Sequence, residues 1–369
     1  MRPFPMSSSS KIKLGLIGCG ERGHQLASLF KEHGGYELHA LADYFAEVAQ
    51  ETGKTFGVEP SRCYGGLNGY KKLLASGVEA VALETPPCFF PEHAAAAMAA
   101  NCHVFLALPV AVDAPGCLHI AALAKQKRCV FVDTQITTDP TNIEVAQRIR
   151  DGGLGKLAFI NTVGCGGGKS DPPKTATIES RLREGVWMAD VALGGGRIAC
   201  FDVHALEAAL WIAGGRPVSA IGKSRICRLE PHGDMNDVTE VIYEFADGLI
   251  LNHCSQALKN NAPERLTCAV FGQSANAEIN YWGRSFLKGG PKHFGGGPVD
   301  ADGPKRSVAA FHKAIIENDF SNPTVARAVD ATLTAILGRE AAARGARLTM
   351  EELLKENKRL ELNLKGLNA

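Results

Sequence analysis

The first third of the chain alternates short apolar runs with segments whose apolar residues recur at helical spacing. Each apolar run is too short for a helix and is typical of a buried strand. Strands that alternate with helices form a parallel sheet whose crossover connections are right-handed. The pattern therefore predicts an α/β domain with a parallel sheet over residues 11–135. Its expected strands are 14–17, 38–42, 78–84, 103–108 and 129–133, and its expected helices are 24–31, 45–56, 69–76, 91–100 and 115–127.

The pattern changes after residue 135. A helix is expected over 143–150, and most later apolar segments read as strands joined by short turns. The dipeptide Asp247-Gly248 between two of them is a strong signal for a β-hairpin. We therefore expect a second domain over residues 136–369, built on a mostly antiparallel sheet with one or two helices on one face. Its expected strands are 157–163, 218–228, 239–245, 249–256, 266–271 and 277–281, with loops at 164–174 and 288–305.

The two ends of the chain carry different signals. Residues 1–10 lack the basic and apolar regions of a signal peptide and are expected to be a disordered leader. Near the other end, Ser321-Asn322-Pro323 supplies a cap and a first-turn proline for a helix through Ala343. Thr349 and Glu352 have the spacing of a capping box, which predicts one more helix. These helices are expected to brace the two domains.

One glycine-rich motif stands between the first strand and the first helix. It reads Gly18-Cys19-Gly20-Glu21-Arg22-Gly23. Gly18 permits a tight turn, Gly20 lets the backbone approach a pyrophosphate, and Gly23 lets the helix pack closely on the strand. Backbone N–H groups at the start of the helix then bind phosphate oxygens. Asp43 ends the second strand about 20 residues after Gly23, where a carboxylate accepts hydrogen bonds from an adenosine ribose and favours NAD over NADP. The alternative is a glycine turn in another kind of α/β domain, with Asp43 as an ordinary strand-end residue.

Composition and charge narrow the class of protein. The 369 residues suffice for two domains with separate cores. With 45% hydrophobic and 21% charged residues and a net charge of +1, the chain has no basic field for nucleic acid or a membrane surface. No apolar run approaches the roughly 20 residues that cross a bilayer. The eleven cysteines are spread singly, without a C-x-x-C pair or metal-ligand spacing, which predicts reduced thiols in the cytoplasm and no metal.

Several further motifs resemble those of the glucose-fructose oxidoreductase / inositol dehydrogenase / MocA family. They are Thr85-Pro86-Pro87 with His93, the segment 109–116, the run from Gly195-Gly196 to His204 and the segment 335–339. The resemblance covers nearly the whole chain, residues 12–367. It implies a Rossmann domain followed by an α/β domain with an open, mostly antiparallel sheet, and homodimers or homotetramers formed through that sheet. It also implies hydride transfer between NAD and a hydroxyl carbon of a sugar, cyclitol or glycoside.

The resemblance assigns roles to particular positions. The family's Glu-Lys-Pro falls on Ala107-Leu108-Pro109, so Leu108 replaces the lysine that points at the substrate hydroxyl and offers no donor, acceptor or charge. In a second family pattern two acids flank a histidine, and it falls on Cys200, His204 and Glu207. The first acid is therefore a cysteine here. The residues expected at the cofactor are Gly18, Cys19, Gly20, Glu21, Arg22, Gly23, Asp43, Thr85, Pro86, Pro87, His93, Ala107, Pro109 and Gln135.

The candidate catalytic groups have competing readings. His204 and Glu207 lie on one face of an expected helix, and a carboxylate beside an imidazole raises its basicity and fixes its tautomer, as a general base requires. The alternative is a satisfied histidine at a helix start. Asp202 is either a rival acid or base or a helix cap. Cys200 is a nucleophile only where a neighbouring base lowers its pKa, and is otherwise a buried thiol. Side chains with weaker claims on the reacting end are Lys169, Lys174, Arg181, Arg183, His253 and Gln256.

Three functions are compatible with these residues. The first, the family-level expectation, is an NAD-dependent oxidoreductase of a sugar-like substrate, with His204 as the base and Glu207 orienting it. The second is glycoside cleavage through a transient keto intermediate, with NAD never released. The third is an NAD-binding member with weakened or altered catalysis, which Leu108 and Cys200 favour.

Overall fold

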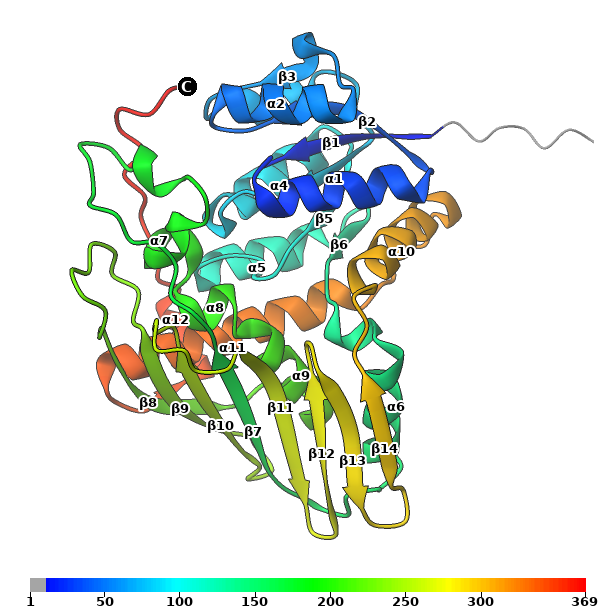
Figure 1. Cartoon of the computed structure of the whole chain (residues 1–369), viewed down its shortest axis with the longest axis vertical. Helices are drawn as coiled ribbons and strands as arrows, with labels where there is room; N and C mark the ends of the chain where they lie inside the picture. Colours follow the sequence, from blue (N-terminus) through cyan, green and yellow to red (C-terminus); the bar gives the residue numbers. More distant parts are fainter. Residues whose placement is uncertain (1–10) are drawn as a thin grey trace, which may run out of the picture.

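The computed structural model describes residues 11–369, so the leader expected over residues 1–10 lies outside the described residues. Two β-sheets divide the chain (Figure 1). A six-stranded sheet forms the amino-terminal part, and a nine-stranded sheet lies in the carboxy-terminal part. The long helix α11 (Thr324–Arg344) packs against elements of both parts. Within residues 11–369, no helix is both long enough and apolar enough to cross a membrane.

The first sheet is parallel throughout, with the strand order β3-β2-β1-β4-β5-β6. The order reverses between β1 and β4, and in open parallel sheets ligands bind beyond the carboxyl ends of the strands at such a point. The predicted parallel α/β architecture is confirmed. Its strands are β1 (Ile12–Ile17), β2 (Tyr36–Ala42), β3 (Cys63–Tyr64), β4 (Ala80–Leu83), β5 (His103–Leu106) and β6 (Val130–Val132).

Helices cover both faces of the first sheet because its strands are apolar on both sides. Leu14 and Leu16 of β1 belong to one core cluster, together with buried residues of α1, α2 and α10. Ile17 and Leu83 belong to the other cluster, with buried residues of α3, α4 and α5. The bounds are α1 (Glu21–His33), α2 (Ala46–Phe56), α3 (Gly69–Leu74), α4 (Phe90–Ala99), α5 (Ala114–Leu123) and α10 (Gly303–Glu317).

The second sheet has the order β14-β13-β12-β11-β7-β10-β9-β8-β15. Only the pair β7 and β10 is parallel among its described pairings, so the predicted mostly antiparallel sheet is confirmed. The hairpin expected at Asp247-Gly248 joins β9 to β10, and Gly248 has a φ of 83° there. The strands are β7 (Leu157–Cys165), β8 (Ser219–Arg225), β9 (Val238–Glu244), β10 (Ile250–Gln256), β11 (Arg265–Gly272), β12 (Ala275–Asn280), β13 (Arg284–Gly289), β14 (Phe294–Pro298) and β15 (Leu348–Thr349).

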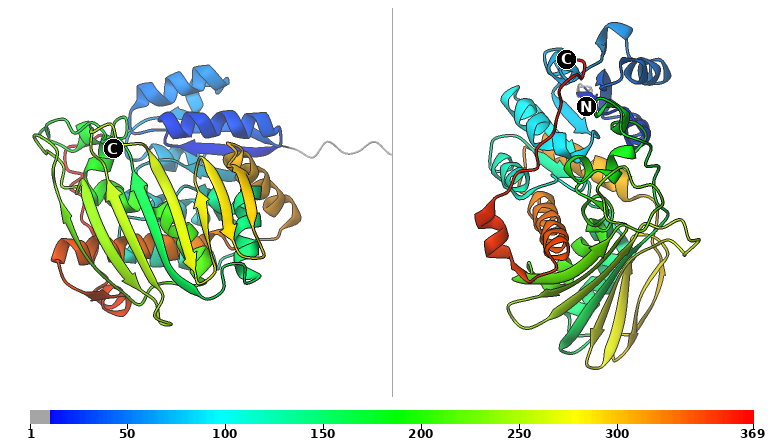
Figure 2. Two further views of the ribbon diagram at one scale, coloured as in Figure 1. Left: turned by 60° about the horizontal axis from the view of Figure 1, so that its bottom comes forward. Right: turned by 90° about the vertical axis from the view of Figure 1, so that its left-hand side faces the viewer.

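Helices cover one face of the second sheet, and the other face is open (Figure 2). The covering helices are α6 (Pro140–Arg150), α9 (Val203–Ala213) and α11. Strand β9 shows the reason, because it buries every second residue, including Val241 and Tyr243, and exposes the residues between them. The sheet therefore presents alternate side chains to the helices and to the open face.

Some element boundaries differ from the prediction. The loop expected over 288–305 was wrong, since β14 lies inside it and α10 begins at Gly303. Strand β14 reads Phe-Gly-Gly-Gly-Pro, in which no apolar alternation marks a strand. Helix α11 begins at Thr324, one residue later than expected, so Pro323 occupies the N-cap position. The capping box of Thr349 opens α12 (Met350–Glu356) as predicted. Two short helices, α7 (Val191–Gly194) and α8 (Arg197–Cys200), precede α9.

Two segments of the carboxy-terminal part return to the first sheet. Beyond α12 the chain runs back along the first part (Figures 1 and 2, red), where the N–H of Leu67 donates to the carbonyl of Asn368 over 3.0 Å. The N–H of Asn368 donates to Tyr44 Oη over 3.1 Å. Tyr44 Oη itself donates to Glu179, on the long connection after β7, over 2.8 Å. The segment that follows Asp43 is thus held from both sides.

Candidate functional site

The glycine turn has the geometry that its motif predicts. Gly18 has a φ of +98°, and a Cβ there would lie 2.4 Å from the carbonyl carbon of Glu84. A Cβ on Gly23 would lie 2.0 Å from the carbonyl oxygen of Gly18. Both positions therefore exclude a side chain. At Gly20, by contrast, a Cβ would meet no heavy atom of the described residues within 4 Å. The backbone at the start of α1 is thus open to a ligand.

Asp43 stands beside this turn at the end of β2. Its carboxylate accepts hydrogen bonds from the backbone N–H of Cys19 over 2.8 Å and of Phe45 over 2.9 Å. Each oxygen keeps a second lone pair for a ribose hydroxyl. Burial raises the pKa of Asp43, while the two backbone N–H groups counteract the rise. The open backbone at Gly20 and the fixed acceptor at Asp43 fit the phosphate and adenosine ribose of NAD.

A charged side chain of the second part also reaches this end. The guanidinium of Arg183 lies 3.7 Å from the ring centre of Phe45 and pairs with Glu47 over 2.6 Å. The residues directly after Asp43 include no arginine, so an arginine at this end could not be predicted from the sequence. Arg183 therefore lies at the Asp43 end of the site, and not at the reacting end where it was a weak candidate.

Other expected cofactor residues lie around the end of β4. Thr85 follows this strand and its Oγ1 lies 3.4 Å from His93 Nδ1. The His93 ring packs 4.4 Å from the ring of Tyr70, and burial lowers the pKa of His93 to about 4. His93 is therefore neutral near pH 7 and supports Thr85.

A second group of charged residues lies at the carboxyl ends of β4 and β6, away from β2 and Asp43 in the strand order. Glu84 follows β4, and Asp133 follows β6. Arg22, in the first turn of α1, contacts Asp133 through Nη2 and donates from Nη1 to Gln25 over 2.6 Å. Gln135 donates to the same Asp133 oxygen over 3.4 Å. Sequence reasoning placed Arg22 and Gln135 at the cofactor but missed Glu84 and Asp133, although both end strands as Asp43 does.

His204 lies in the first turn of α9 and faces this group. Its ring centre is 4.8 Å from that of Tyr281, which sequence reasoning also missed. Tyr281 Oη donates to Gln135 over 2.7 Å. Burial lowers the pKa of His204 to about 4, so the imidazole is neutral near pH 7. Its Nδ1 is buried and has no hydrogen-bond partner among the described residues.

Glu207 follows on the same helix but does not orient His204 in this structure. Thr137 Oγ1 donates to Glu207 Oε1 over 3.4 Å, and Oε2 is buried without a partner in the described part of the chain. Burial raises the pKa of Glu207 to about 7. A carboxyl group poised near neutrality can accept or donate a hydrogen bond. The predicted fixing of the His204 tautomer by Glu207 is therefore not seen.

Asp202 is the N-cap residue of α9, and Cys200 ends α8 just before it. Asp202 is fully buried, where Arg197 Nε lies at 3.3 Å, His253 Nε2 at 3.4 Å and Ser255 Oγ closer still. Its side chain makes no capping hydrogen bond to α9. The capping reading of Asp202 is therefore wrong, and its reading as an acid or base stays a prediction. Burial of the thiol group raises the pKa of Cys200 to about 12, so the thiol stays protonated near pH 7, which does not favour the nucleophile reading.

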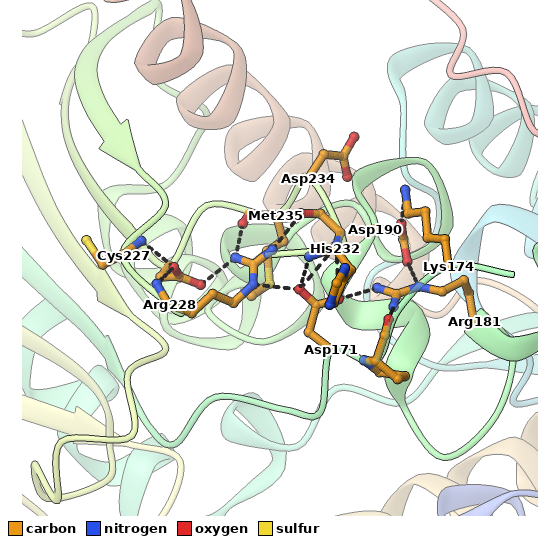
Figure 3. Close-up of polar contacts among 12 residues, drawn as sticks. Asp171, Lys174, Arg181, Asp190, Cys227, Arg228, His232, Asp234 and Met235 are labelled. Carbon is orange, nitrogen blue, oxygen red and sulfur yellow. Dashed lines mark hydrogen bonds and ion pairs between the residues drawn. The ribbon is translucent and has the colours of Figure 1, made fainter. Parts of the chain in front are cut away.

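Two of the loop cations expected near the reacting end, Lys174 and Arg181, are paired with carboxylates elsewhere (Figure 3). Lys174 pairs with Asp190 over 3.0 Å, and Arg181 contacts both Asp190 and Asp171 over 2.6 Å. Arg228 adds a contact of 2.7 Å to Asp171. Burial alone would raise the pKa of Asp171, but hydrogen bonds from the two arginines hold it well below its usual range. These charges fasten the connection after β7 to the segment between β8 and β9.

Leu108 lies just beyond β5, next to the ends of β4 and β6 in the strand order. It is 8% exposed and packs in the apolar core, with Ala107 against the same cluster. The position thus contributes packing and no charge. In residues 11–369, no group of three or more His, Cys, Asp or Glu side chains is arranged to hold a metal ion.

Comparisons with known proteins match both parts of the chain. A family profile described as "Oxidoreductase family, NAD-binding Rossmann fold" matches residues 12–134, and one described as "GFO/IDH/MocA C-terminal domain" matches residues 143–278. The chain is 26% identical over 215 residues to an uncharacterized oxidoreductase of Synechocystis sp., an alignment covering 57% of this chain and 53% of that protein. The chain therefore spans about half the length of this relative.

Two further similarities extend over more of the chain. It is 23% identical over 274 residues to inositol 2-dehydrogenase of Rhizobium meliloti, with 73% of each protein covered. The crystal structure of an inositol dehydrogenase homolog complexed with NAD+ from Azotobacter vinelandii has a TM-score of 0.75 and 18% identity, covering 92% of this chain and 98% of that chain. At this identity the likeness concerns the fold.

Proposed function

The chain belongs to the glucose-fructose oxidoreductase / inositol dehydrogenase / MocA family, whose first domain is an NAD-binding Rossmann fold, and from this premise we propose that it is an NAD-dependent oxidoreductase acting on a hydroxyl carbon of a sugar, cyclitol or glycoside. The observation that carries the proposal is the placement of a neutral histidine, His204, among buried polar atoms without partners. The open backbone at Gly20 and the carboxylate of Asp43 support the cofactor part of the proposal.

In the proposed reaction, one group of residues binds the cofactor and another acts on the substrate hydroxyl. The amino end of α1 binds the phosphates, and Asp43 accepts hydrogen bonds from the ribose. Bound NAD supplies the acceptor for the hydride that leaves the substrate carbon. His204, neutral near pH 7, takes the proton of the substrate hydroxyl. The carbon thus loses a hydride and its oxygen loses a proton, which leaves a carbonyl.

A substrate with several hydroxyl groups would provide hydrogen-bond partners for buried polar atoms that have none among the described residues. Buried polar groups are normally hydrogen-bonded, so orphan atoms at one edge call for an explanation. A ligand with several hydroxyl groups would satisfy them, because a hydroxyl both donates and accepts. Within residues 11–369 the buried atoms without a hydrogen-bond partner at this edge are Glu84 Oε1, Asp133 Oδ1, His204 Nδ1 and Glu207 Oε2.

Calorimetry and a substrate screen test the proposal. We expect nucleotide-free protein to bind NAD, and NADH absorbance to grow when sugars, cyclitols or glycosides are added with NAD. Protein that gives no heat with either NAD or NADH would contradict the proposal at its cofactor step. Glycoside cleavage without net NADH would indicate that the hydride returns to the substrate and the bound dinucleotide is retained.

A second candidate is an NAD-binding member with altered catalysis. Leu108 favours it, since this buried apolar side chain stands where the family's lysine is expected. General acid–base assistance contributes about 10²–10⁴-fold in rate, so loss of one group slows turnover without abolishing it. NAD binding with no NADH formed from any polyol in the screen would favour this candidate over the first.

We also propose that two or more copies associate through the open face of the second sheet, and that the protein resides in the cytoplasm. Ile242 is 51% exposed and Phe159 is 42% exposed on neighbouring parts of this face. Phe159 stacks on Phe271 with ring centres 4.5 Å apart, and Ile221 and Ile250 extend the apolar area. Large exposed apolar patches mark interaction sites on soluble proteins. The cysteines in the described residues are unpaired thiols, in accord with a reducing compartment.

A charge on this face should break the assembly. We expect Ile242→Lys to lower the molar mass in sedimentation experiments to that of the monomer, because the ammonium would be buried in an apolar interface. Ile316→Lys is the matched control, since Ile316 is 62% exposed on α10, away from the sheet. Equal molar masses for wild type and Ile242→Lys would count against the interface.

A further inference from the structure

We propose that Arg22 supplies the positive charge at the reacting end, where its guanidinium, held by Asp133, stabilises the negative charge that develops on the substrate oxygen as His204 takes the proton. The inference rests on the proposed function and adds one group to it. Arg22 would touch the substrate oxygen and is thus a catalytic residue, whereas Asp133 is its positioning residue.

The strand order places Arg22 and Asp133 on opposite sides of the carboxyl ends of β4 and β5. Arg22 lies in the first turn of α1, which follows β1, and Asp133 follows β6, with β4 and β5 between these strands. Their contact therefore spans the ends of β4 and β5. These are the ends that Glu84 and Leu108 follow. A cation from α1 thus reaches the region in which Leu108 leaves none.

A continuous series of contacts joins Arg22 to His204. Arg22 contacts Asp133, Gln135 donates to Asp133 over 3.4 Å, and Tyr281 donates to Gln135 over 2.7 Å. The Tyr281 ring then lies 4.8 Å from the His204 ring. The guanidinium and the imidazole are therefore linked through Asp133, Gln135 and Tyr281, and they are close enough for the charge of Arg22 to act on His204.

Arg22 keeps both its charge and spare donors. Burial alone would lower the pKa of Arg22, but the charges of Asp133 and Glu84 outweigh it and raise the pKa. A guanidinium carries five N–H donors, and Asp133 and Gln25 occupy two of them in the structure. The Arg22 side chain is 32% exposed, whereas that of Asp133 is 2% exposed. The carboxylate that holds Arg22 is therefore buried, while the arginine side chain stays partly accessible.

The chemistry assigned to Arg22 involves no proton transfer. An arginine stays protonated in proteins, so it cannot act as the acid or base. It acts by preorganised electrostatic stabilisation of a developing oxyanion, which is worth more in a site of low dielectric than in water. The hydroxyl proton still passes to His204.

The first test detects the charge of Arg22 through its effect on the pKa of His204, and it requires no catalytic turnover. NMR of histidine-labelled apo protein, with His204 assigned from His204→Gln, measures the pKa of this imidazole. The charges that act on His204 are those of Asp133, Arg22 and Asp202. We expect Arg22→Met to raise the pKa of His204 and Asp133→Asn to lower it, while Arg22→Lys leaves it near the wild-type value. Arg347→Met, at an exposed arginine that pairs with Glu244, is the control and should change nothing.

The second test uses kinetics on a substrate from the screen. Arg22→Met should lower kcat by about 10²–10³-fold, as loss of an oxyanion donor does, with little change in NAD affinity by calorimetry. Arg22→Lys should retain much of the rate. Leu108→Lys in the Arg22→Met background should restore part of it, because it returns a cation to the neighbouring strand end.

The outcomes separate this inference from the proposed function. An unchanged His204 pKa in Arg22→Met, or a wild-type kcat in that variant, would overturn the role of Arg22. A wild-type protein that turns over no polyol would overturn the proposed function instead. The pKa measurement still decides the placement of Arg22 in that case, since it needs neither NAD nor substrate.

Discussion

Replacing Gly20 with valine is expected to abolish NAD binding while the protein keeps its fold. The φ of Gly20 is −68°, which valine adopts, and a Cβ there meets no described atom within 4 Å. The side chain would instead fill the space in which the phosphates approach the start of α1. Loss of two hydrogen bonds to a charged group costs about 3–6 kcal/mol, which is a loss of affinity of about 100-fold or more.

Gly215→Val is the matched control for this experiment. A Cβ on Gly215 also meets no described atom within 4 Å, and Gly215 lies between α9 and β8, away from the turn. Both variants should therefore melt near the wild-type temperature, and only Gly20→Val should lose its heat of NAD binding. Wild-type NAD affinity in Gly20→Val would show that the dinucleotide does not lie over this turn.

His204→Gln should lower kcat/KM by about 10²–10⁴-fold, the usual contribution of a general base. NAD affinity should stay unchanged, because the imidazole lies at the other end of the site from Asp43. The wild-type pH profile provides a second measurement. Since burial lowers the pKa of His204 to about 4, the imidazole is free to accept a proton above that pH. We therefore expect no loss of kcat/KM from this group around pH 6.5, and a fall only as the pH approaches 4.

A second buried histidine serves as the control. Burial also lowers the pKa of His103 to about 4, but His103 opens β5, at the far end of the strand from the site. Its Nδ1 accepts a hydrogen bond from the N–H of Cys129 over 3.1 Å. His103→Gln should therefore affect thermal stability and leave kcat/KM unchanged. A His204→Gln variant with near wild-type kcat/KM would mean that another group takes the hydroxyl proton.

The fold and the glycine turn could be predicted from the sequence because local rules govern both. Gly18 and Gly23 are required by close backbone contacts that any such turn makes, and the spacing to Asp43 follows from one strand–helix–strand unit. Apolar runs in the first part and alternation in the second marked the two sheets. Strand β14 was not predicted because three of its five residues are glycine, so it shows no alternation of apolar and polar side chains.

The reacting end was only partly predictable because its residues meet through tertiary packing. His204 was found through a resemblance, but its neighbour Tyr281 comes from a turn far along the chain. Glu84 and Asp133 end parallel strands, so the rule applied to Asp43 could have singled them out. The burial of Asp202 at the start of α9 could not be predicted from the sequence, since Ser255 and His253 approach it from strand β10.

The two hydrogen bonds at Tyr44 Oη affect how the two parts of the molecule can move. Glu179 holds its hydroxyl from the connection after β7, and Asn368 approaches the same oxygen from the carboxy-terminal segment. Any hinge movement that separates the two sheets must pull on the loop beside Asp43 or rupture these contacts. We therefore expect a dinucleotide bound at Asp43 to leave more slowly while these contacts are intact than after they are removed.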